Sequence, residues 1–249
     1  MGTGGAGVNR LGDALRYLND PFNWTRRDGI LDLLVEHLRI SALAVLAAMV
    51  VAVPVGMLLG HTGRGGGFTV ALSNVSRAVP TLALLTVFAV TPIGFGPTAT
   101  TIALAVFAVP PMLTNTYVGF RGVDRDVVEA SRAMGFSERQ VATRVELPLA
   151  MPLLMTGVRT AAVQVVATAT LAALVAGGGL GRIITLGFRQ QDYGAVVAGA
   201  ILVAALAVLT EVALVAVSWA LTPGQKRLPF LTARRASPVP EPTAAGVPL

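Results

Sequence analysis

Long apolar runs recur along this chain, each about the length of a membrane-crossing helix. A helix needs ~20 predominantly apolar residues to cross the hydrocarbon core of a bilayer. Five runs meet or approach that length, at residues 40–60, about 68–91, 98–120, 149–176 and 194–221. The pattern predicts an all-α integral membrane protein with five spans, in contact with membrane lipid.

The composition agrees with a membrane protein and argues against a soluble enzyme. Hydrophobic residues make up 54% of the 249 and charged residues only 13%, against roughly 25% charged in an ordinary soluble domain. The net charge of +6 arises from basic residues in short loops, so membrane topology explains it and no nucleic-acid partner is expected. With no cysteine, and with His37 and His61 far apart in the sequence, no metal site is expected.

Polar residues interrupt several of the predicted spans. The second span should bend around residues 77–80, and the third holds two prolines directly before Asn115 and Thr116. Polar groups are costly in lipid and should face a cavity or another helix. The candidates for a translocation path are Ser76, Thr81, Asn115, Thr116, Gln164 and Thr168. The alternative is that the Ser and Thr hydroxyls bond their own helix backbone or help helices pack.

One charge lies inside each of the last two spans. Arg159 and Glu211 lie the same number of residues from the predicted inner end of their spans. Arg159 follows the inner end of span four, and Glu211 precedes the inner end of span five. At ~1.5 Å per residue both side chains lie equally deep. We expect a salt bridge or shared polar network between them, the alternative being that Arg159 reaches toward the inner surface.

Most basic residues fall on one side of the predicted membrane. The segments after spans one and three and after the last span carry Arg64, Arg77, Arg121, Arg125, Arg132, Arg139, Arg144, Lys226, Arg227, Arg234 and Arg235. The loops after spans two and four carry only Arg182 and Arg189, so the richer side should be cytoplasmic and the amino terminus external. The amino-terminal arginines oppose this orientation, and a sixth crossing is the alternative.

The two ends of the chain differ from the spans. Residues 1–39 should form an amino-terminal tail, in which residues 29–40 have apolar positions at helical spacing. These residues form either an interfacial helix or the first turns of span one. Residues 40–221 should be the transmembrane domain, and residues 222–249, rich in Pro, Ala and Ser, a disordered cytoplasmic tail.

The polar segment 121–148 lies between spans three and four. Asp124 is a plausible cap for a first helix, Gly135 a stop, and Ser137 to Gln140 a capping box that begins a second helix, which Pro148 should end. A solvated loop would not require such closely spaced helix signals, nor the apolar residues among them. The segment should therefore be a cytoplasmic helix-turn-helix that faces another surface.

The spacing of Glu129-Ala130, Gly135, Val145 and Leu147-Pro148 resembles the EAA signature of bacterial ATP-binding-cassette (ABC) importer permeases. Ser131 and Val145 depart from it, where the family has Ala and Ile. The resemblance implies that the segment couples the membrane helices to an ATPase subunit. The residues expected to do so are Glu129, Ala130, Ser131, Met134, Gly135, Phe136, Leu147 and Pro148.

Further stretches, at residues 79–85, 115–124, 145–161, 169–181 and 198–211, resemble permeases for glycine betaine, choline, carnitine and related osmoprotectants. The resemblance implies a five-helix type I importer core in the bacterial plasma membrane. It also implies a second permease, identical or related, two ATPase subunits and an extracytoplasmic substrate-binding protein. The alternatives are a permease for another small solute, or a secondary transporter or channel.

The chain carries no Gly-x-x-x-x-Gly-Lys-Ser/Thr phosphate-binding loop. We therefore expect it not to be an enzyme and to bind no cofactor, with ATP and Mg on the partner ATPase. The run at residues 177–181 follows span four, and Gly178, Gly179 and Gly181 permit the close backbone approach that a gate requires. A plain turn is the alternative.

Overall fold

The computed structural model describes residues 4–221, and every regular element among them is helical. The all-α prediction is confirmed. The elements are α1 (Gly4–Asn19), α2 (Pro21–Thr25), α3 (Ile30–Thr62), α4 (Gly66–Ala78), α5 (Thr81–Ala89), α6 (Pro97–Arg121), α7 (Arg125–Ala133), α8 (Glu138–Gln140), a π-helical segment (Val141–Glu146), α9 (Leu147–Ala169), a 3₁₀ segment (Thr170–Val175), α10 (Gly181–Gln190) and α11 (Tyr193–Leu221). The predicted tail at 222–249 lies outside the described residues.

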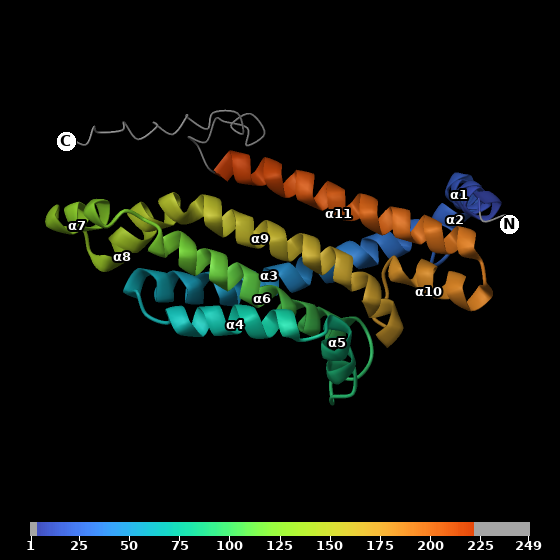
Figure 1. Ribbon diagram of the computed structural model, residues 1–249, viewed down its shortest axis with the longest axis horizontal. Coiled ribbons are helices and arrows are strands. Elements are labelled where there is room, and N and C mark those ends of the chain that lie inside the picture. Colours follow the sequence, from blue (N-terminus) through green and yellow to red (C-terminus); the bar gives the residue numbers. More distant parts are fainter. Residues whose placement is uncertain (1–3, 222–249) are drawn as a thin grey trace, which may run out of the picture.

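Four long helices lie side by side along the long axis of the molecule (Figure 1). They are α3, α6, the continuous path Glu138–Val175 that contains α9, and α11, and each is long and apolar enough to cross a membrane. Segment α7–α8 lies at one end of this bundle, whereas α1, α2 and α10 lie at the other (Figure 1). Spans one, three, four and five of the sequence prediction correspond to these helices.

The second predicted span is broken into two short helices. Helix α4 ends at Ala78 and α5 begins at Thr81, with Pro80 at its N-cap in an extended conformation. Proline lacks the N–H that would continue the helix, and it forces the preceding residue out of the helical region. The predicted bend is therefore present. Together α4 and α5 lead the chain from the α7–α8 end back to the start of α6 (Figure 1), and neither of these two helices is long enough to cross a membrane by itself.

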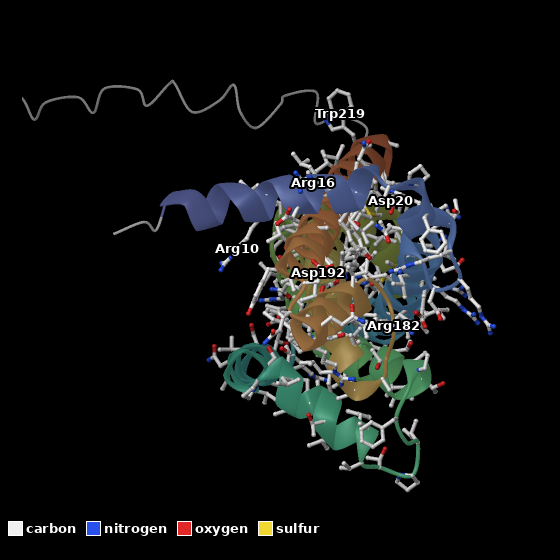
Figure 2. All side chains as sticks on the ribbon, turned by 90° about the vertical axis from the view of Figure 1, so that its right-hand side faces the viewer. Arg10, Arg16, Asp20, Arg182, Asp192 and Trp219 are labelled. Atoms are coloured by element: carbon white, nitrogen blue, oxygen red, sulfur yellow. The ribbon has the colours of Figure 1, made fainter. Side chains whose placement is uncertain are left out.

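Residues 30–39 are the first turns of α3, which runs unbroken from Ile30 to Thr62 with Gly29 at its N-cap. They are therefore not a separate interfacial helix. Ile30 and Leu33 continue the buried face of the span and pack in the core, whereas Leu31, Val35 and Leu38 are exposed. Helix α1, which the sequence analysis did not predict, lies across the end of the bundle, with Arg10 and Arg16 on it (Figure 2).

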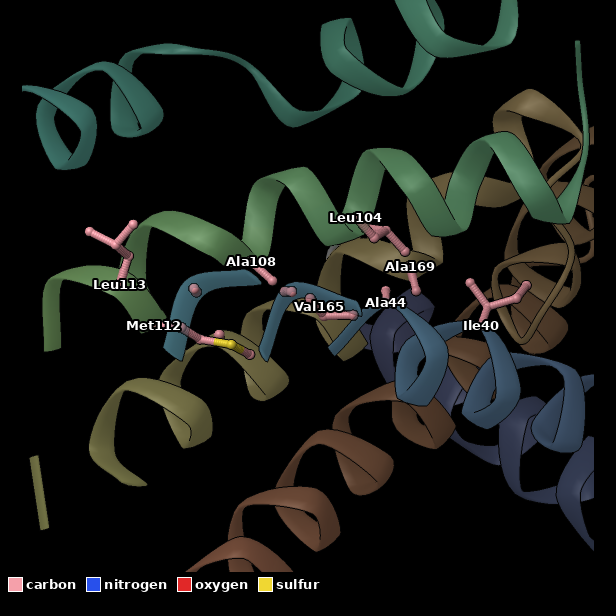
Figure 3. Packing of buried hydrophobic residues seen from close by; sticks show 11 residues of the cluster. Ile40, Ala44, Leu104, Ala108, Met112, Leu113, Val165 and Ala169 are labelled. Atoms are coloured by element: carbon pink, nitrogen blue, oxygen red, sulfur yellow. The ribbon is translucent and has the colours of Figure 1, made fainter. Parts of the chain in front are cut away.

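A stripe of small residues lets α3 and α6 pack closely. The stripe repeats every four residues along α3, at Ala44, Ala48, Ala52, Gly56 and Gly60. A Cβ at Gly56 would lie 2.7 Å from the Thr116 Cβ, and one at Gly60 would lie 2.5 Å from the Phe120 Cβ. Such small-residue seams are typical of membrane helix pairs. Figure 3 shows the row of core residues along these helices, with Ile40 and Ala44 of α3 toward the same end as Leu104 of α6, and Met112 and Leu113 of α6 toward the other end.

The arrangement predicts which residues an impermeant thiol reagent reaches in intact cells. Arg16 on α1 and Met134 after α7 are exposed and lie at opposite ends of the bundle (Figure 1), and the chain has no cysteine of its own. We expect Arg16→Cys to be labelled and Met134→Cys to be labelled only after the cells are opened. Labelling of Met134→Cys but not Arg16→Cys in intact cells would reverse the orientation.

Candidate functional site: a coupling segment, a polar pocket and a glycine loop

The coupling segment, residues 121–148, forms a helix, a turn and a second helix at one end of the bundle (Figure 1). The Asp124 carboxylate accepts a hydrogen bond of 2.9 Å from the Asp126 backbone N–H and caps α7. Gly135 has a φ of +86°, a left-handed conformation that side chains with a Cβ disfavour. Ser137 begins α8 through a capping box with Gln140. The helix-turn-helix and its predicted caps are present.

The second helix does not end at Pro148, contrary to the sequence prediction. Helix α8 passes into the π-helical segment, and this passes directly into α9, where Pro148 lies in the first turn. Proline has no N–H to donate to the preceding turn, and the π-helical segment directly before it is the kind of local adjustment that accommodates a proline within a continuous membrane helix. The coupling segment is therefore joined to the fourth span without a break.

The exposed surface of the coupling segment is partly apolar. Met134 is 70% exposed and Phe136 36% exposed, and Glu129, Ala130 and Pro148 are exposed as well. Large apolar side chains at the water-facing end of a membrane protein indicate a surface that another protein covers. The structure thus leaves these residues accessible for docking, as the sequence analysis expects.

Ser131 does not belong to that exposed surface. Its side chain is buried, and its hydroxyl donates a 2.7 Å hydrogen bond to the Val127 carbonyl. It lies on the face of α7 that packs inward, like Val128, which forms an apolar cluster with Phe120 and Val141. Leu147 packs against the same cluster, so Ser131 and Leu147 support the segment from within rather than facing outward.

An exposed ion pair holds α7 to α8. Arg132 donates from Nε and Nη2 to the two carboxylate oxygens of Glu138, each at 2.9 Å. These hydrogen bonds raise the pKa of the Arg132 guanidinium. Bidentate geometry of this kind fixes orientation as well as adding attraction, so it braces the turn at Gly135.

A polar pocket of about 300 Å³ lies between α4, α6 and α9. It brings together three of the predicted path residues, Ser76, Asn115 and Gln164, which come from three different helices. Sequence reasoning missed the rest of its lining: Ser73, Phe107, Pro111, Thr114 and Thr160. Thr114 has a buried hydroxyl with no hydrogen-bond partner in the described part of the chain. Two of the predicted path residues also bond their own helix: the Ser76 hydroxyl donates to the Ser73 carbonyl at 2.9 Å, and the Asn115 amide donates to the Pro111 carbonyl at 2.8 Å. A path role for the residues that line the pocket stays a prediction.

The other predicted path residues do not line this pocket. Thr116 is fully buried, donates to the Met112 carbonyl at 2.8 Å and packs against Gly56, so it serves helix packing, which was the alternative for the threonines. Thr81 lies in the first turn of α5, and Thr168 lies near the end of α9. A path role for Thr81 and Thr168 remains a prediction.

The glycine loop, residues 177–181, is held against the first span. Gly178 and Gly179 have φ of +83° and +75°, and a Cβ on Gly178 would overlap the Glu36 carboxylate. The Gly179 N–H donates to Glu36 Oε2 at 2.8 Å, and the Leu180 N–H donates to His37 Nδ1 at 3.2 Å. Gly181 approaches Thr170 as closely. The close backbone approach that the sequence analysis expects is present, whereas a role of the loop as a gate stays a prediction.

His37 joins this loop to the fourth span. Its Nδ1 accepts the Leu180 N–H, so its Nε2 carries the proton and donates to the Val166 carbonyl at 2.9 Å. The side chain is fully buried. Sequence reasoning missed Glu36 and His37; their signal was two adjacent polar residues within the apolar spacing of residues 29–40.

The predicted contact between the two intramembrane charges is present. Arg159 Nε lies 3.2 Å from Glu211 Oε1, which links α9 to α11. We expect Arg159→Ala and Glu211→Ala each to lower the thermal stability of the purified protein, because each leaves the other charge without its partner. The double variant should be more stable than additivity predicts, by at least ~0.5 kcal/mol. Strictly additive losses would mean that the two charges do not stabilise each other.

These features together define a multi-pass helical membrane protein with a polar pocket between its helices and a partly apolar helix-turn-helix at one end. A family model described as "Binding-protein-dependent transport system inner membrane component" matches residues 52–221. The chain belongs to this family, and it is therefore a membrane component of a bacterial transport system rather than a catalytic subunit.

Proteins similar to this chain are named as permeases of transport systems or as an ABC transporter. The choline transport system permease protein OpuBB of Bacillus subtilis is 36% identical over 198 residues, 79% of this chain and 91% of the relative. The carnitine transport permease protein OpuCB of Listeria monocytogenes is 39% identical over 188 residues, 76% and 86% of the two chains. An inward-facing structure of the MetNI methionine ABC transporter is similar in fold, with a TM-score of 0.69, 24% identity, and coverage of 82% of this chain and 99% of that chain.

Proposed function

We propose that this chain is the permease subunit of an ATP-driven ABC importer that carries a quaternary-ammonium osmoprotectant into the cell. The observation that carries this proposal is its similarity, over most of both chains, to permeases named for choline and carnitine transport. A further relative, from Bacillus subtilis, is named for glycine betaine, carnitine and choline together and is 35% identical.

The ATPase is a separate chain in this proposal. The 249 residues contain no phosphate-binding loop, and the exposed Met134 and Phe136 offer an apolar surface for a soluble partner. Two ATPase copies would dock on the coupling segments of two permeases, which are copies of this chain or a related pair. A substrate-binding protein would deliver solute at the opposite end, where the glycine loop lies.

The polar pocket suits weak, transient contact with a passing solute rather than tight binding. None of the described residues that line the pocket is charged, and Phe107 is the one aromatic residue among those described residues. Tight recognition of a quaternary ammonium uses a cage of several aromatic rings. Selectivity would therefore come from the binding protein, and the pocket would let a hydrated, partly polar solute pass.

Growth in high salt tests the proposed substrate class. The chain is expressed with its neighbouring genes in a bacterial host that lacks its own osmoprotectant uptake. We expect growth and uptake of labelled glycine betaine, choline or carnitine, and no uptake when this chain alone is deleted. Uptake of another solute, such as methionine, with none of the quaternary ammonium compounds would keep the permease role and overturn the substrate class.

A further inference from the structure

His61, in the last turn of α3, contacts two carboxylates of the coupling segment. Its Nδ1 lies 2.5 Å from Glu146 Oε2 and its Nε2 lies 3.1 Å from Glu138 Oε2. The imidazole is largely buried, with 15% of its side chain exposed. The contact with Glu146 is a hydrogen bond of the imidazole, and the contact with Glu138 places a second carboxylate beside the other ring nitrogen.

Glu146 is the buried member of this cluster. Its side chain is fully buried, its Oε1 accepts no hydrogen bond within the described residues, and Arg125 Nη1 is 3.9 Å from that oxygen. A buried carboxylate is costly unless it is paired, so His61 and Arg125 together stabilise its charge. Glu146 is also the last residue of the π-helical segment, a distortion often found at functional sites.

The cluster joins elements that are far apart in the sequence. His61 ends the first span, Arg125 lies on α7, Glu138 begins α8, and Glu146 leads into the fourth span. Glu138 also holds Arg132, so α7 and α8 are fixed to each other as well as to α3. The contact between Gly60 and Phe120 brings the end of α3 against α6 at the same level.

We propose that His61 is a positioning residue through which movement of the coupling segment reaches the first span. This inference rests on the proposed function, in which an ATPase moves the coupling segment. The fourth span follows that segment covalently, and the third span precedes it. The first span is not next to it in the sequence. It packs along the third span through the small-residue stripe, and His61 adds a direct side-chain contact between the end of the first span and the coupling segment itself.

The test compares variants of the whole importer, reconstituted in lipid with its ATPase and binding protein. Solute uptake and ATP hydrolysis are measured together, which gives the solute taken up per ATP. His61→Ala removes both carboxylate contacts; it should retain the ATPase but lower uptake per ATP at least about tenfold, because one hydrogen bond to a charged group already shifts an equilibrium by that factor. His61→Arg, which donates to both carboxylates and stays charged, should restore most of that ratio.

Thr62→Ala is the matched control. Thr62 is the exposed neighbour of His61, and its hydroxyl donates to the Leu58 carbonyl of its own helix at 2.8 Å. This variant should transport with the same uptake per ATP as the wild type. If Thr62→Ala lowered uptake per ATP as much as His61→Ala does, the end of α3 would simply tolerate no substitution, and the positioning role would be overturned. Failure of His61→Arg to restore uptake per ATP would overturn it as well.

A second pair of variants covers the case in which His61→Ala does not fold. Glu138 is exposed, so Glu138→Ala should fold. This variant removes the contact of Glu138 with His61 as well as its ion pair with Arg132, whereas Arg132→Ala removes only the ion pair. We expect Glu138→Ala to lower uptake per ATP more than Arg132→Ala does. Equal effects would overturn the inference. Normal uptake per ATP in His61→Ala would also overturn the positioning role of His61, but it would leave the proposed function standing. A wild-type complex that shows no ATP-driven uptake would overturn the proposed function itself.

Discussion

Replacing Gly135 by valine should reduce ATP-driven uptake at least about tenfold while leaving the permease inserted in the membrane. Gly135 has a φ of +86° between α7 and α8, and a β-branched residue is strained there by about 1–2 kcal/mol. A Cβ at Gly135 would meet no described atom within 4 Å. The strain should therefore distort the turn, and with it the surface formed by Met134 and Phe136, rather than disrupt the core.

Co-purification with the ATPase measures this effect, alongside permease abundance in the membrane. Gly67→Val is the control, because Gly67 has open space around it and no left-handed φ. We expect Gly67→Val to retain the ATPase as the wild type does. If Gly135→Val retains the ATPase fully and transports at the normal rate per molecule, residues 121–148 are not the coupling segment.

Replacing His37 by leucine should cause the largest loss of stability among the single substitutions considered. The change leaves the buried Leu180 N–H without its partner and removes the hydrogen bond that the Val166 carbonyl accepts from His37. An unsatisfied buried group costs ~1–3 kcal/mol and a lost hydrogen bond ~0.5–1.5 kcal/mol, so the loss should be about 1.5–4.5 kcal/mol. Uptake should fall as well, because the glycine loop loses one of its two attachments to α3.

Thermal unfolding of the purified permease measures this loss. His37→Gln is the matched variant, since its amide has one acceptor and one donor group and preserves part of the two hydrogen bonds. We expect its unfolding temperature to lie between those of the wild type and His37→Leu. Equal unfolding temperatures for the wild type and His37→Leu would show that His37 does not hold the loop.

The sequence predicts the parts of this molecule that depend on local pattern. Long apolar runs predict α3, α6, α9 and α11, because a membrane helix must satisfy its own backbone hydrogen bonds and be apolar along its length. Pro80 predicts the break between α4 and α5, and the Ser137 capping box predicts the start of α8. The contact between Arg159 and Glu211 is predicted because the apolar runs place the inner ends of both spans, and both side chains lie equally deep from those ends.

The sequence does not predict contacts that depend on how the helices approach one another. His37 meets Leu180 across 143 residues, and His61 meets Glu146 across 85. Ser131 matches the docking pattern by position, but the inward face of α7 depends on the Phe120 cluster. Helix α1 begins in a glycine-rich stretch, and its packing against α11, with Ala14 fully buried, is also a tertiary contact.

In the proposed function this chain forms the passage of an importer driven by a separate ATPase. Uptake of labelled glycine betaine, choline or carnitine is measured into liposomes that hold the purified permease and ATPase, with binding protein outside and ATP inside. We expect uptake that requires ATP, the binding protein and both membrane-associated chains, and that falls with Gly135→Val. Uptake that proceeds without ATP or without the ATPase, driven by an ion gradient instead, would contradict the proposed function.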